Sequence, residues 1–255
     1  VLSMVAFSEV SSLLLPGWHV VSVEHVDYLG ALKFFRDEPR TITVTALIRP
    51  DAEHPDDLVA ECTLSAERTL PGQDTPQRTV HGNGVVRLSA SPRSAPEAAK
   101  PGRKAKSSLS AEQIYSVYFH GDAYQVLDSV WRAKDGSAVG RFADDLPPNH
   151  VPVDAPLLIG PRLAELCFQT AGMEEMGREG KNALPLHVGS WEVFGTPSED
   201  GALVCTARPT DDGFECLVQR GNGTVVARMR QYWTVVTPNP LPDDQAALLA
   251  GVMAK

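Results

Sequence analysis

Apolar and polar residues alternate along much of the chain with the two-residue period of half-buried β-strands. The alternation is clearest at residues 41–48, where one face carries Ile42, Val44, Ala46 and Ile48. The same reading predicts strands at residues 18–28, 58–69, 80–89, 124–131, 186–194, 202–208, 215–220 and 224–236. Asn222 and Gly223 separate the last two, which indicates a tight hairpin. The pattern therefore favours antiparallel β structure.

Two longer segments have a helical period instead. Residues 4–15 are apolar at most positions, which predicts a largely buried helix that ends at Pro16 and Gly17. Residues 156–176 place Leu163, Leu166, Cys167 and Ala171 at helical spacing. Shorter helices are expected from Ser110, where Gln113 completes a capping box, and at residues 243–253.

A break between two similar halves lies at residues 91–110, which are rich in Pro, Ala, Ser and Lys and have no hydrophobic period. Each half then consists of one long helix and an antiparallel sheet, so the fold class is α+β. We predict a first unit at residues 1–95, a linker at 96–110 and a second unit at 111–255.

Composition narrows the classes of function. The chain has 255 residues and a formal net charge of −9, which does not suit bulk binding to nucleic acid or to an anionic membrane. No apolar run approaches the roughly 18 residues that span a bilayer. The four cysteines have no CxxC spacing, so we expect no metal site and a reduced, cytoplasmic setting.

Two short motifs carry the chemistry. Residues 115–127 read YSVYFHGDAYQVL, and residues 163–172 read LAELCFQTAG. The first resembles the GYxYGPxF motif of polyketide synthase dehydratase domains, and more closely the YFHGPAYQ variant of polyunsaturated fatty acid synthases. Its matching positions are Tyr118, His120, Gly121, Tyr124 and Gln125, with Asp122 in place of Pro. The second resembles their DxxxQ element, with Glu165 in place of the acid and Gln169 in place of the Gln.

The resemblance implies a double hotdog, in which two antiparallel sheets each wrap a central helix. It implies dehydration of a β-hydroxyacyl chain that an acyl carrier protein holds on its phosphopantetheine, with no further cofactor. Partners would be the carrier protein, neighbouring synthase domains and a second copy in a homodimer. The family's catalytic His lies in HxxxGxxxxP, whose end would be Val1 and Leu2, with Ser3 in place of Pro. That His is expected ahead of Val1.

Within this framework Glu165 and Gln169 are the candidate catalytic residues. The acid must stay protonated to help hydroxide leave, and burial among apolar neighbours raises a carboxyl pKa in that direction. Gln169 is one helical turn later and would orient the carboxyl. Candidate substrate contacts are Tyr118, His120, Gly121, Tyr124 and, in a later strand, His187.

Other interpretations stay open at this point. The domain is alternatively a non-catalytic, acyl-binding relative, or a double-hotdog isomerase or cyclase. Glu165 is alternatively a solvent-facing helix residue, and His25 a buried structural histidine on one face with Val21 and Val23. The basic linker residues Lys100, Arg103, Lys104 and Lys106 are either solvated or a docking site for an acidic partner.

Overall fold

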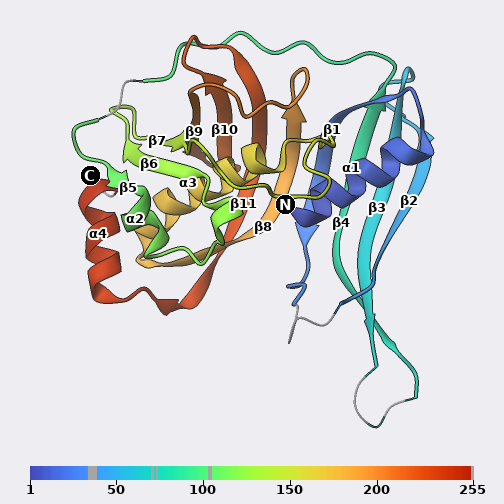
Figure 1. Ribbon diagram of the computed structural model, residues 1–255, viewed down its shortest axis with the longest axis horizontal. Coiled ribbons are helices and arrows are strands. Elements are labelled where there is room, and N and C mark those ends of the chain that lie inside the picture. Colours follow the sequence, from blue (N-terminus) through green and yellow to red (C-terminus); the bar gives the residue numbers. More distant parts are fainter. Residues whose placement is uncertain (34–38, 70–71, 73, 103–104, 254–255) are drawn as a thin grey trace.

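One antiparallel sheet runs through the whole molecule. The computed structural model describes residues 1–33, 39–69, 72, 74–102 and 105–253. Within them, strands pair in the order β2-β3-β4-β1-β8-β11-β10-β9-β7-β6-β5. The sheet wraps first around one helix and then around another (Figure 1).

The first half consists of a helix and four strands. Its elements are α1 (Leu2–Leu14), β1 (His19–Tyr28), β2 (Ile42–Pro50), β3 (Asp57–Arg68) and β4 (Gln77–Ser89). Met4 and Phe7 of α1 are fully buried against the strands. The helix ends ahead of Pro16 and Gly17, as its sequence predicts.

The second half is larger and surrounds helix α3. Its elements are β5 (Leu109–Ser110), α2 (Ala111–Tyr115), the 3₁₀ turn η1 (Asp122–Tyr124), β6 (Leu127–Arg132), β7 (Ala138–Phe142), α3 (Pro161–Glu179), β8 (Lys181–Val193), β9 (Leu203–Thr210), β10 (Gly213–Arg220), β11 (Val225–Pro240) and α4 (Asp243–Met253). The capping box of Ser110 and Gln113 is confirmed. Nearly every residue of α3 is buried, because the sheet and α4 surround it (Figure 1).

The halves join where β1 pairs with β8. Val23 lies opposite Trp191, and Asp27 lies opposite His187. Trp191 is fully buried and donates its indole N–H to the carbonyl of Ile159 at 2.9 Å. The double hotdog is therefore held together by a continuous ladder as well as by side-chain packing.

Several boundaries differ from the sequence expectation. Helix α3 begins at Pro161 rather than near residue 156, because Gly160 takes a left-handed backbone (φ +56°) and Pro161 fits the first helical turn. The expectation that His25 is buried with Val21 and Val23 is wrong. A bulge between Glu24 and Asp27 turns His25 outward, with φ +49°.

None of the described helices is long and apolar enough to cross a membrane.

Candidate active site

Helix α3 presents Glu165 and Gln169 to the same side, one turn apart. Glu165 is 9% exposed and Gln169 is 1% exposed. The Gln169 amide donates from Nε2 to Glu165 Oε1 at 3.1 Å. The interpretation of Glu165 as a solvent-facing residue is therefore wrong, and the pairing expected from the spacing is present.

A histidine completes the environment of the acid. His120 precedes η1, and its Nε2 lies 3.0 Å from Glu165 Oε1. The His120 ring stacks on Phe119 at 5.2 Å between centroids and meets Tyr118 edge-on at 5.1 Å. Its backbone carbonyl accepts a hydrogen bond from Gln125 Nε2. The buried Nδ1 of His120 has no partner among the described residues.

Three tyrosines fix the position of Gln169. Tyr115 donates to Gln169 Oε1 at 2.8 Å, and Gln169 Nε2 donates to the Tyr124 carbonyl at 2.8 Å. Tyr118 donates to the Gln169 backbone carbonyl at 2.9 Å. Because both ends of the amide are engaged, its N–H group points at Glu165. The motif at residues 115–127 is thus tied to α3 by hydrogen bonds.

The charge state of Glu165 differs from expectation. Burial raises the pKa of Glu165, but hydrogen bonds from His120 and Gln169 and the charge of His120 lower it below its usual value. The expected raised pKa is therefore wrong in direction. The physical reason is the hydrogen bond from His120, which favours the ionised carboxyl.

These groups line a cavity of about 200 Å³ between the two halves. Glu165, Gln169, Tyr118 and His120 form its polar part, and its remaining wall is largely apolar, from Phe119, Phe168, Ala183, Leu184, Pro185 and Tyr232. Val1 also lines it, and the chain start lies near the centre of the molecule (Figure 1). A small cavity with one buried carboxyl and an apolar wall suits proton transfer to an acyl chain.

Comparison with known proteins decides the family. A family profile described as “Polyketide synthase dehydratase N-terminal domain” matches residues 89–242. The chain belongs to the polyketide synthase dehydratase family.

Solved structures agree on the fold. The dehydratase domain from the CurF module of curacin polyketide synthase superposes with a TM-score of 0.68 at 19% identity, over 92% of this chain and 82% of that one. The CurK dehydratase domain gives 0.66 at 16% identity, over 92% and 81%. A trans-AT dehydratase from Brevibacillus brevis gives 0.64 at 17% identity, over 92% and 83%. No curated protein sequence matches the chain.

The polyketide synthase dehydratase domain does not bring all its predicted site residues together. Gly121 and the side chain of Tyr124 are not part of the cavity wall, although the Tyr124 carbonyl holds Gln169. His187 lies at the join of the halves, where its Nδ1 is 2.6 Å from Asp27 Oδ1. The prediction that His187 lines the substrate site with Glu165 is not supported by this position.

Tyr115 is a residue of the candidate site that the sequence did not single out. It donates to Gln169 and accepts from the Leu127 N–H at 2.7 Å, so it joins helix α2, strand β6 and helix α3. Burial raises the pKa of Tyr115 above its usual value, so its hydroxyl stays protonated and able to donate. Its place at the start of the YSVYFHGDAYQVL motif was the available signal.

Proposed function

We propose that this dehydratase domain removes water from a β-hydroxyacyl thioester with Glu165, paired with His120, as the proton donor. The contact that carries this proposal is the one of 3.0 Å between His120 Nε2 and Glu165 Oε1, in the wall of an otherwise apolar cavity. A carboxyl and an imidazole at this distance share one proton, which the pair can give to a leaving hydroxyl.

The reaction needs two proton movements. A base takes the α-proton, electrons move to form the Cα–Cβ double bond, and the β-hydroxyl leaves as water with the proton from the Glu165–His120 pair. The family's base is expected just ahead of Val1, and Val1 lines the same cavity. Two inactive variants of the CurK dehydratase replace a His and an Asp, so that domain needs both a histidine and an acid.

Gln169 acts as a positioning residue in this proposal. Its Nε2 holds Glu165 Oε1, and its own amide is held by Tyr115 and the Tyr124 carbonyl. Tyr118 and His120 stand beside the cavity where the acyl chain would pass. Fixed side chains of this kind reduce the reorganisation that proton transfer requires.

The proposed reaction also implies which partner delivers the substrate. A synthase domain receives its acyl chain as a thioester on the phosphopantetheine of an acyl carrier protein, and we propose that the domain uses no other cofactor. Neighbouring synthase domains and a second copy of this chain are the further partners proposed. Lys100 is one candidate contact for the acidic carrier, whereas Arg103 and Lys104 lie outside the described residues.

The test uses the polypeptide that carries this domain and a β-hydroxyacyl thioester as substrate. Glu165→Gln should lower the rate of enoyl formation by about 100-fold or more, the usual contribution of a general acid. Glu175→Gln is the matched control, since Glu175 is also a buried acid of α3 but pairs with Arg178. Equal rates for Glu165→Gln and the unchanged protein would contradict the proposal. Carrier binding without turnover in the unchanged protein would assign a non-catalytic role.

A further inference from the structure

Three cysteine sulfurs meet in the core of the second half. The Sγ atoms of Cys167, Cys205 and Cys216 all lie within 4.8 Å of one another. The first two are 3.8 Å apart. None of the three is in a disulfide, and their side chains are at most 1% exposed. Among the described residues, these three cysteines are the one group whose possible ligand atoms lie close enough together to bind a single metal ion.

The fold brings them together from three elements. Cys205 on β9 pairs with Val218, and Cys216 on β10 pairs with Ala207, so the two thiols are near neighbours on adjacent strands. Both face inward, where α3 packs across the sheet and supplies Cys167. The cysteines are far apart in sequence and lack any metal-binding spacing, which is why the sequence indicated no metal site.

The spacing fits a three-coordinate metal. A metal–sulfur bond of about 2.3 Å places the sulfurs of a trigonal site about 4.0 Å apart. The sulfurs lie 3.8 Å apart in one pair and no more than 4.8 Å apart in the others, within about 1 Å of that value. Small side-chain rotations would therefore be enough to bind the ion.

The donor atoms select the kind of ion. All three are sulfur, and thiolates favour soft ions such as Cu(I) over hard ions. Zn²⁺ normally takes four ligands, and the cluster supplies three sulfurs.

We propose that Cys167, Cys205 and Cys216 form a binding site for a soft, thiophilic metal ion, best matched by Cu(I). Each sulfur that binds as a thiolate releases its proton to solvent, and no electron is transferred, so uptake strengthens as pH rises. The bound ion would tie α3 to β9 and β10. This site is separate from the dehydration proposed above and does not depend on it.

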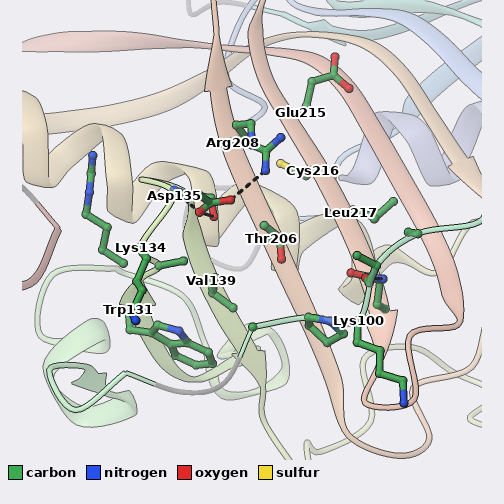
Figure 2. Close-up of a pocket in the computed structure, with 18 of the residues that line it drawn as sticks. Lys100, Trp131, Lys134, Asp135, Val139, Thr206, Arg208, Glu215, Cys216 and Leu217 are labelled. Carbon is green, nitrogen blue, oxygen red and sulfur yellow. Dashed lines mark hydrogen bonds and ion pairs between the residues drawn. The ribbon is translucent and has the colours of Figure 1, made fainter.

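A large cavity lies on the opposite side of strand β10 from the sulfur cluster. It measures about 820 Å³, lies against the sheet of the second half and includes Cys216 in its wall (Figure 2). Glu215 and Leu217, on either side of Cys216, also line it. Since neighbouring strand residues point to opposite faces, the Cys216 sulfur is separated from this cavity by strand β10 itself.

The test is a titration of the folded, reduced protein with Cu(I) under anaerobic conditions in the presence of a competing chelator. We expect uptake of one equivalent, copper–thiolate absorption in the near ultraviolet and a Tm that rises with Cu(I) concentration. Cys205→Ala should abolish all three, and Cys167→Ala provides a second variant if the first unfolds. Cys62→Ala is the matched control, because Cys62 is buried in the first half beside Ser11.

Two results would overturn the existence of the site, and a third would overturn its assignment to Cu(I). One is the absence of Cu(I) uptake by the folded protein, which would identify the cluster as apolar packing of thiols. The other is uptake that Cys205→Ala and Cys167→Ala retain in full while folded. A parallel Zn²⁺ titration should show weaker binding, and tighter binding of Zn²⁺ would contradict the three-coordinate assignment.

Discussion

Glu165 is ionised more readily than an isolated buried carboxyl because its neighbours donate to it. His120 Nε2 and Gln169 Nε2 both lie within 3.1 Å of Oε1. Burial acts in the opposite direction and raises the pKa of Glu165, but the donors outweigh it. In the proposed reaction the proton would therefore be shared between Glu165 and His120. This arrangement differs from the raised pKa of Glu165 that burial by itself predicts.

Replacement of His120 tests this balance. His120→Phe removes the hydrogen bond, so the pKa of Glu165 should rise, because burial then dominates. His120→Gln is the matched variant, because its side-chain amide can still donate to Glu165 Oε1. In that variant the pKa of Glu165 should stay closer to its value in the unchanged protein. Carboxyl ¹³C NMR titration of Glu165 measures the shift. Titration of Glu165 at the same pH in His120→Phe as in the unchanged protein would refute the explanation.

The same contact has a consequence for stability. A carboxyl whose folded pKa is below its unfolded value adds stability above the unfolded pKa and loses it as pH falls through the folded pKa. The pKa of Glu165 is lowered, so its pairing contributes at neutral pH and is lost on acidification.

Helix α3 is the element that sets the site, and its small residues permit close packing on it. A Cβ added to Gly172 would lie 2.3 Å from the Tyr118 hydroxyl oxygen. That hydroxyl donates to the Gln169 carbonyl, so the glycine is what allows the residue 115–127 motif to contact α3. By contrast, a Cβ at Gly251 of α4 would meet no atom within 4 Å.

Two glycine substitutions should therefore change the free energy of unfolding in opposite directions. Gly172→Ala should lower the free energy of unfolding by about 1–3 kcal/mol, since it forces Tyr118 out of place. Gly251→Ala, also within a helix, should raise it by about 0.5–1 kcal/mol, because Ala is the better helix former. Denaturant unfolding measures both values. An unchanged stability in Gly172→Ala would show that Tyr118 moves without cost.

The sequence could predict the elements whose pattern is local. Glu165 and Gln169 share a face because they are four residues apart, and the structure confirms this. The contact of His120 with Glu165 could not be predicted, because His120 lies outside any helix or strand and its position depends on the stacking of Phe119 and on Gln125. His25 was misplaced for a similar reason, since a bulge breaks the alternation on which the expectation relied.

At the scale of the whole molecule, the join of β1 and β8 makes two halves into one folded unit. Val26 and Val188 pair across it, and both are fully buried, as is Trp191. The candidate site draws Val1 from one half and Glu165 from the other. The chain between the halves, by contrast, has no helix or strand in its described residues from 90 to 108. The sheet rather than the linker should therefore keep the site assembled.

Cleavage of the linker tests that conclusion and the predicted boundaries at residues 95 and 111. A protease site placed at residues 92–97, which are mostly exposed, should be cut in the folded protein. We expect the two fragments to elute together on gel filtration and to retain dehydration, because buried strand pairing outlasts the covalent link. Val188→Asp in the cut protein should separate them, since it places a charge in the buried join. Separation of the fragments without that substitution would mean that the linker, not the β1–β8 ladder, holds the halves together.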